Sequence, residues 1–365
     1  MQLDFFPSRT LTTYLAKMFV IRIAAVLVML VLVLMALDLL SATGKILAIE
    51  GNGNGEIWRY VTLRVPQLIS RFLPYSVLLA TLITLVTLNQ NSEVIAMKAA
   101  GLSAHQVLAP LLLTAAAIAL VSFAFNERIV TRANATLKAW EAVEFGPIPQ
   151  ETGVRANVYL TDGDNILTAS SLVGNGDAIA LDDVTWYKRA PGGMILEQVR
   201  ATGATFADPG WRLENPVRFD VGAAASREIE TLVVAEELTP ERIDVQSVDI
   251  EGQSFFELAR TIEAFEALGQ RTSEMEAKWW HRLAGPLSAL LMPLLGSIAA
   301  FGLARSGQLF VRAIIGMALG FAYFVVDNAA LAMGSFGGYP PLLAAWAPFL
   351  LFLLLGETVL IRTEE

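Results

Sequence analysis

Eight cationic side chains lie near the ends of long apolar segments, at spacings that would bring several of them together. Arg64 and Arg71 are seven residues apart and two further pairs are four apart, so each pair occupies one face of a helix. Cations gathered on one cavity would bind the phosphates of an anionic lipid headgroup. The alternative is that they only anchor helix ends at a membrane surface. The candidates are Lys45, Arg64, Arg71, Arg128, Arg132, Lys138, Lys278 and Arg282.

A second candidate lies in the polar segment 89–103, between two apolar runs. Its sequence predicts a short helix that Ser92 caps, that Glu93 favours through the helix dipole and that Gly101 ends. A plain connecting turn would need only Asn and Gly, and it remains the alternative. The more specific interpretation is a helix on which a cytoplasmic partner docks. The contact residues would be Ser92, Glu93, Met97, Lys98 and Gly101.

The remaining reactive side chains argue against an enzyme. Cysteine is absent, which excludes thiol catalysis and Cys-bound zinc, and two histidines leave little scope for a histidine triad or metal cluster. We interpret His281 as part of an interfacial aromatic belt, His105 as inert, Asp327 as an interfacial helix cap and Glu357 as a snorkelling side chain. No G-x-x-x-x-G-K-[ST] motif occurs, so we expect this chain to bind no cofactor or metal of its own.

The composition indicates a membrane protein with one water-facing part. Of the 365 residues, 55% are hydrophobic and 17% are charged, whereas roughly a quarter of a soluble domain is charged. Residues 127–282 contain 26 of the 35 acidic and 15 of the 26 basic residues, so an acidic middle separates two apolar thirds. The net charge of −9 argues against a nucleic-acid partner, which would require a basic face.

Six apolar stretches are long enough to cross a membrane, which takes about 20 residues. An even number of spans places both termini on one side. Cations in the short flanks favour an inside N-terminus by seven to four, so the positive-inside bias places both termini in the cytoplasm and the middle domain outside. We predict spans at about 16–39, 66–89, 104–126, 282–304, 309–331 and 341–361.

Residues 150–250 predict an antiparallel β-domain. Short segments rich in β-branched and aromatic residues alternate with turn clusters such as Asp162-Gly163-Asp164-Asn165 and Asp208-Pro209-Gly210. This spacing is typical of a sandwich or jelly roll. Ser254 and Glu257 then predict a capping box at the start of a helix that leads back to the fourth span.

Three spans, an outer β-domain and three further spans resemble the LptF/LptG family of lipopolysaccharide-export ABC transporter permeases, over essentially the whole chain. The segment 91–103 is similar to the family's coupling helix, in which the glutamate at Glu93 engages the ATPase LptB. Asn126-Glu127 and the segment 276–287 resemble the family's third-span exit and the approach to its fourth span. The LptG branch is favoured over LptF by the likeness of the fifth span at Gly316, Gly320, Phe321, Tyr323 and Val326-Asp327.

The resemblance implies a polytopic α-helical membrane protein with six transmembrane helices (3+3) and an inserted periplasmic β-jelly-roll-like domain, divided at 1–126, 127–272 and 273–365. It also implies partners: an LptF-like permease, a dimer of LptB-like ATPases that bind ATP and Mg, a single-span LptC-like protein and lipopolysaccharide. The chain would extract lipopolysaccharide from the outer leaflet of the inner membrane and pass it to a periplasmic bridge, while the ATPase hydrolyses ATP.

Two alternatives stay open. The chain could be the LptF-type half of the same transporter, or a membrane-anchored periplasmic lipid-binding scaffold without energy coupling, in which Glu93 would be dispensable. An intramembrane enzyme is disfavoured, because the spans contain no paired carboxylates, Ser/Lys dyad or histidine cluster.

Overall fold

The computed structural model describes residues 7–147, 155–174, 179–190, 192–223, 225–236, 238–239, 250–267, 271–301 and 309–364. The chain forms two compact units. The first comprises residues 1–39, 64–131 and 253–365 and is helical, whereas the second comprises residues 40–63 and 132–252 and contains all the described strands.

Long helices with few charges dominate the first unit. They are α1 (Arg9–Leu47), α2 (Asn54–Gln90), α4 (Ala104–Phe125), α8 (Ser273–Phe301), α9 (Leu309–Ser335) and α10 (Pro341–Glu364). Because a helix satisfies its own backbone hydrogen bonds, an apolar segment of this length can remain in lipid. Helix α1 extends seven residues before and eight residues after its predicted span of 16–39, and α2 begins 12 residues before its predicted span of 66–89.

The structure confirms a membrane-spanning α-helical protein with an inserted β-domain. By length and composition, five described segments can cross a membrane, and α8, with 29 residues, is a further long helix in the same unit. The turn between the fourth and fifth predicted spans, with Arg305, falls on residues 302–308 and lies outside the described residues. The five segments are Arg9–Leu47, Asn54–Gln90, Ala104–Ala142, Ala313–Ser335 and Pro341–Arg362.

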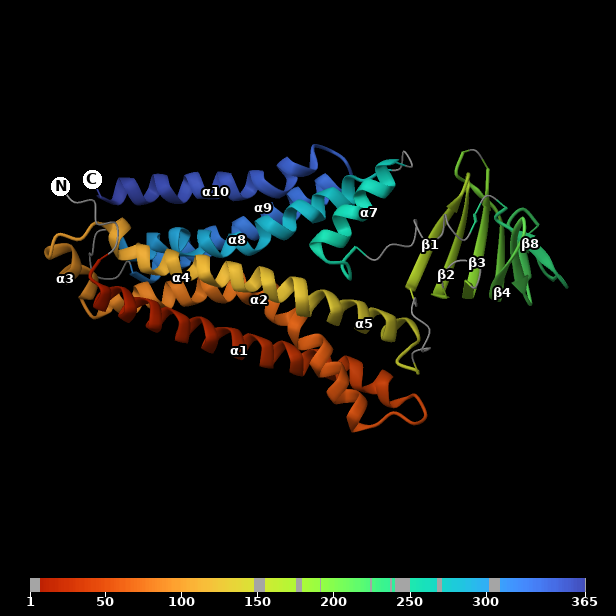
Figure 1. The fold of residues 1–365 in the computed structure, drawn as a ribbon, viewed down its shortest axis with the longest axis horizontal. Coiled ribbons are helices and arrows are strands. Elements are labelled where there is room, and N and C mark those ends of the chain that lie inside the picture. Colours follow the sequence, from red (N-terminus) through yellow and green to blue (C-terminus); the bar gives the residue numbers. More distant parts are fainter. Residues whose placement is uncertain are drawn as a thin grey trace. The chain divides into compact units, whose positions relative to one another are not determined.

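Helix α8 is central to the packing of the first unit, because it contacts α4, α9 and α10. Figure 1 shows the start of α1, the short helix α3 (Glu93–Ala99) and the end of α10 at one end of this unit. The start of α1 and the end of α10 therefore lie at the same end of the helical unit. The buried core at this end includes Leu15, Phe19, Val94, Met97 and Leu360.

A π-helical turn, η1 (Asn126–Val130), joins α4 to α5 (Thr131–Ala142). Such insertions occur often at functional sites. Helix α7 (Phe255–Ala267) begins at the predicted capping box: the Ser254 N–H donates to Glu257 Oε2 at 2.8 Å, and the Glu257 N–H donates to Ser254 Oγ at 3.3 Å. The Glu127 carboxylate also accepts from the Phe255 N–H, so η1 holds the start of α7.

The strands of the second unit form one antiparallel sheet that divides at β4. Strand β4 pairs with β6 through its first half and with β5 through its second half, and the other sheet neighbours follow the order β1-β2-β3-β4-β5-β8. A single core lies under the sheet, and the Trp211 indole donates to the Leu238 carbonyl at 2.7 Å within it. The strands are β1 (Arg155–Asp162), β2 (Asn165–Val173), β3 (Ala180–Arg189), β4 (Ile195–Ala207), β5 (Gly210–Glu214), β6 (Val217–Asp220), β7 (Ala225–Glu228) and β8 (Leu232–Val234).

Candidate functional site

Helix α3 is a seven-residue helix whose termini were only partly predicted. The prediction that Ser92 caps it is wrong, because Ser92 has a φ of 60° and its side chain makes no capping hydrogen bond. Only Asn91 and Ser92 separate α2 from α3, and Ser92 makes this turn in a left-handed backbone conformation. Gly101 ends the helix as predicted: it has a φ of 88°, and the Leu102 N–H donates to the Met97 carbonyl.

The two faces of α3 have different roles. Val94 and Met97 are buried in the core of the first unit, so Met97 anchors the helix and is not on its outer surface. Ile95 is 53% exposed, and Lys98 is also exposed. Glu93 stands at the start of the helix, where its carboxylate accepts from the Tyr14 hydroxyl on α1 at 3.3 Å. The surface offered to a partner therefore includes an acidic, a basic and a large apolar side chain.

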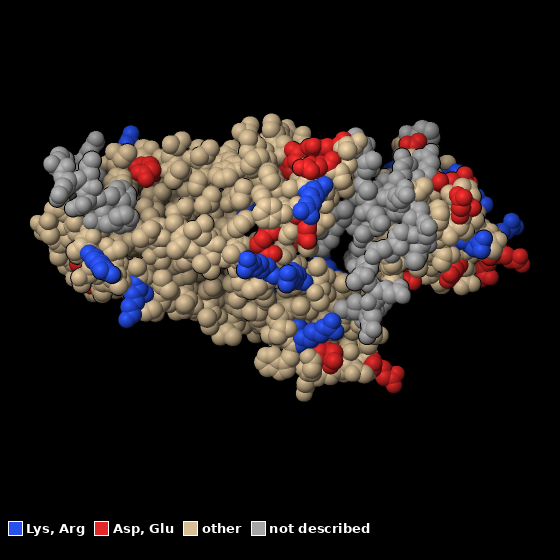
Figure 2. All heavy atoms as spheres, in the orientation of Figure 1, with Lys and Arg blue, Asp and Glu red and all other residues tan. Residues whose placement is uncertain are grey.

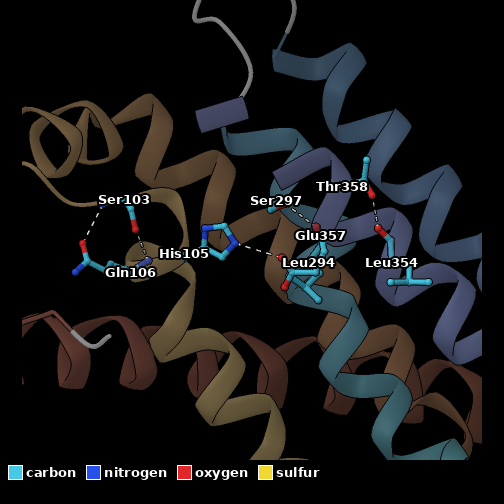
Figure 3. Close-up of polar contacts among 8 residues, drawn as sticks. All are labelled: Ser103, His105, Gln106, Leu294, Ser297, Leu354, Glu357 and Thr358. Atoms are coloured by element: carbon cyan, nitrogen blue, oxygen red, sulfur yellow. Dashed lines mark hydrogen bonds and ion pairs between the residues drawn. The ribbon is translucent and has the colours of Figure 1, made fainter. Parts of the chain in front are cut away.

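The helix after α3 is fixed at its first turn and linked to α10. Ser103 and Gln106 form a reciprocal capping box at the start of α4, with N–H···O distances of 3.2 and 3.0 Å. His105 Nε2 lies 3.2 Å from Glu357 Oε2 on α10, and Figure 3 shows the two side chains pointing toward one another. His105 is therefore not inert, and Glu357 does not simply snorkel. This pair joins two helices that are 252 residues apart in sequence.

Three of the eight predicted cations are neutralised by nearby carboxylates. Arg64 binds Asp38 at 2.7 Å, where the two side chains are 32% and 23% exposed. The other two pairs each join residues of one unit and have N···O distances of 2.7 and 2.8 Å. These cations are less available to a phosphate than their spacing predicted. The two further pairs are Lys138–Glu251 and Lys278–Glu274.

Three other cations lie apart from these ion pairs. Arg128 on η1 and Arg132 on α5 are exposed. Lys45, in the second unit, lines an open pocket with Glu141 and Glu144. Figure 2 shows acidic and basic side chains close together beyond a broad uncharged face of the helical unit.

The last two cations, Arg71 on α2 and Arg282 on α8, line one cavity of about 300 Å³. His281 and Asp327, for which the sequence predicts only interfacial roles, line it as well. Asp327 is 6% exposed and its Oδ2 lies 2.9 Å from His281 Nε2. Asp327 stands eight residues before the end of α9, so its interpretation as a helix cap is wrong. The sequence feature that could have indicated this site is Asp327 itself, a single acidic residue within an apolar span.

The chain has clear relatives among known proteins. The sequence profile of the family described as "Lipopolysaccharide export system permease LptF/LptG" matches residues 13–362. The "Lipopolysaccharide export system permease protein LptG" of Escherichia coli (strain K12) is 25% identical over 315 residues, which is 83% of this chain and 84% of the relative. The protein of the same name from Haemophilus influenzae is 25% identical over 326 residues, which is 86% of this chain and 89% of the relative.

Proposed function

The chain belongs to the LptF/LptG family of lipopolysaccharide export permeases, and we propose that it is the LptG-type half of a transporter driven by a separate cytoplasmic ATPase. Family membership makes it a multi-pass inner-membrane permease subunit, and ATP hydrolysis would take place on the partner chain. The LptG names of the matched relatives support the branch. The observation that carries the ATPase proposal is α3, which offers a charged surface at the end of the bundle where both chain ends lie.

The packing of α3 would transmit a displacement of this helix to its neighbours. Its buried residues share one core with α1, through Leu15 and Phe19, and with α4. A close-packed core transmits a displacement instead of absorbing it. Movement of α3 therefore shifts α1 and α4 together, and the His105–Glu357 pair carries the shift to α10. We propose that the ATPase docks on Glu93, with Lys98 and Ile95 beside it.

The substrate cavity forms between this chain and an LptF-like partner. Helix α1 exposes a row of large apolar side chains, among them Leu32 at 65%, and α9 exposes Phe321 at 58%. Such surfaces suit the acyl chains of lipopolysaccharide, and a single-span LptC-like helix could cover part of α1. The exposed Arg128 and Arg132 would contact phosphates. When the ATPase closes, the cavity collapses and its affinity for lipid falls, which is the difference between states that an extraction cycle requires.

The β-domain would accept the extracted lipid in the periplasm. Strand β6 contains Val217 and Phe219, and Val221 directly follows it. These three side chains are between 37% and 46% exposed. Strand residues two apart lie on one face of a sheet, so these three form an apolar surface next to β4. Exposed apolar surfaces of this kind mark interaction sites.

The test is ATP-dependent release of lipopolysaccharide from proteoliposomes that contain this chain, an LptF-type permease and an LptB-type ATPase. Losing one partner of an interfacial charge pair costs about 2–5 kcal/mol, so Glu93→Ala should lower coupled release more than tenfold. Glu263→Ala, on the exposed face of α7, is the matched control.

Each outcome decides between the alternatives. Unchanged release by Glu93→Ala would refute the coupling role of α3. Failure of the purified chain to assemble with any ATPase would favour the periplasmic scaffold. Assembly with a second LptG-type chain in place of an LptF-type chain would assign this protein to the LptF branch.

A further inference from the structure

The cavity that contains Arg71 and Arg282 belongs to a single helical unit, between α2, α4, α8 and α9. Its lining lies near the same ends of four spans. Asp327 is four residues from the predicted end of its span, or about 6 Å at 1.5 Å per residue. The headgroup layer on each side of a bilayer is about 5–8 Å thick. The predicted span therefore places the cavity at the depth where phospholipid headgroups meet the acyl region.

One side of the cavity is suited to a phosphate. The Arg282 guanidinium donates to the Gln253 carbonyl, which fixes its orientation at the wall. Arg71 is exposed, and within the described part of the chain it makes no hydrogen bond or ion pair. Two guanidinium groups with fixed N–H geometry recognise phosphate oxygens well. Ser70, Ser122 and Asn126 add neutral hydrogen-bonding groups to the same lining.

The lining of the cavity also contains an unsatisfied acceptor. Asp327 Oδ1 is fully buried and has no hydrogen-bond partner among the described residues, while Oδ2 is held by His281. An unsatisfied buried carboxylate oxygen is costly, so a ligand that donates a hydrogen bond there gains free energy. A ligand that is only an anion would instead be repelled by this carboxylate.

An aromatic wall completes the lining. Tyr75 and Phe324 both line the cavity, and their rings stack with centroids 3.9 Å apart. Aromatic faces attract cations, above all where water is excluded. The cavity thus combines hydrogen-bond donors for a phosphate, a carboxylate acceptor and an aromatic surface. This combination matches a zwitterion with separate phosphate and ammonium groups.

We propose that this cavity binds the headgroup of a phospholipid that carries a phosphate and a primary amine, namely phosphatidylethanolamine. Arg71 and Arg282 bind the phosphate, and Asp327 accepts hydrogen bonds from the ammonium group. The ligand is a lipid of the surrounding bilayer, distinct from the polyanionic transport substrate. The site lies within one chain, so the proposal does not depend on the ATPase or on the LptF-like partner.

The experiment is native mass spectrometry of the delipidated full chain with phospholipids that share the same acyl chains. Wild-type protein should bind phosphatidylethanolamine at least tenfold more tightly than phosphatidylcholine. Affinity should fall with each added N-methyl group, because each methyl removes one N–H donor. Equal affinity across the methylation series, or tightest binding of phosphatidylglycerol, would overturn the proposal. The series needs no variant, so it decides the question even if a substitution prevents folding.

Variants assign the two halves of the site. Asp327→Asn should reduce the preference for phosphatidylethanolamine over phosphatidylcholine to about twofold, with phosphatidylcholine binding retained. Arg71→Gln and Arg282→Gln should each weaken binding of every phospholipid. The controls Arg260→Gln and Glu263→Gln remove one charge of each sign from the exposed face of α7 and should change nothing. A preference that survives Asp327→Asn would refute the role of the carboxylate.

A soluble headgroup separates the two possible sources of the ligand. Glycerophosphoethanolamine carries the same charges without acyl chains, and at micromolar concentration it should not compete with the lipid. Competition at equal concentration would show that the cavity recognises a free metabolite and would overturn the assignment to a bilayer lipid.

Discussion

Replacing Gly320 with alanine tests how closely α9 is fitted against α2. A Cβ atom at position 320 would lie 2.4 Å from Leu78 Cδ2 and 2.8 Å from Cδ1. Real Cβ atoms essentially never approach another heavy atom so closely, so something must move. Leu78 is 2% exposed and belongs to the main core, and it cannot rotate into open space.

Two opposing terms set the magnitude. Overpacking of a close-packed core costs about 1–3 kcal/mol. Alanine in place of glycine in a helix gains about 1 kcal/mol of propensity. Gly320→Ala should therefore lower the free energy of unfolding by up to about 2 kcal/mol. Gly44→Ala is the matched control: position 44 is in α1 with no atom within 4 Å of its Cβ, so the same substitution should stabilise by about 0.5–1 kcal/mol.

The assay is equilibrium unfolding in mixed micelles, followed by tryptophan fluorescence. A double-mutant cycle with Leu78→Ala isolates the clash, because truncating that side chain removes the atoms that the new Cβ would meet. In the Leu78→Ala background, Gly320→Ala should be neutral or stabilising. The reasoning is refuted if Gly320→Ala destabilises equally in both backgrounds, or if it stabilises the wild-type protein as Gly44→Ala does.

Three further predictions follow from single contacts. Gly334→Ala should destabilise more than the change at position 320, because its Cβ would lie 2.3 Å from the Cβ of Ala344, which no rotamer change can move; the same unfolding assay ranks them. Trp211→Phe removes a buried hydrogen bond from the β-domain core and should cost about 1–3 kcal/mol, measured as faster hydrogen exchange in the strands. His105→Ala removes the side-chain contact with Glu357 and should lower ATP-dependent release by less than loss of the docking carboxylate does, with ATPase binding unchanged.

The elements of this fold were predictable because their signals are local. A membrane span is a continuous apolar run, and the β-domain is marked by turn clusters at short intervals. The capping box at Ser254 and Glu257 depends on residues only three apart, and it is present as predicted. The end of α3 at Gly101 follows for the same reason, since a left-handed residue there is most easily a glycine.

The contacts between elements were not predictable in the same way. His105 meets Glu357 across 252 residues and His281 meets Asp327 across 46, and nothing in the sequence near either partner indicates the other. Ser92 failed as a cap because the turn geometry, and not the residue's capping preference, decides its backbone conformation.

Spacing alone also overestimated the shared role of the cations. Seven residues do place Arg64 and Arg71 on one face of α2, as predicted. Their surroundings differ, however, because Asp38 on α1 neutralises Arg64. Arg71 instead lines a cavity with a second arginine from α8. A headgroup site is thus defined by which carboxylates are close to each cation, and this depends on helix packing.

The two ends of the helical unit are joined by α4 and α8. Helix α4 contacts α3 at one end, and at the other it contributes Ser122 to the cavity lining. Helix α8 packs along α4 and places His281 and Arg282 in the same cavity. A headgroup held by α2, α4, α8 and α9 resists any tilt that separates these helices. If the ATPase drives such a tilt, binding of the ATPase and of the phospholipid must oppose each other by the same factor, because coupling between two binding equilibria is reciprocal. The composition of the bilayer would then set how much of the ATPase's binding energy reaches the transport cavity.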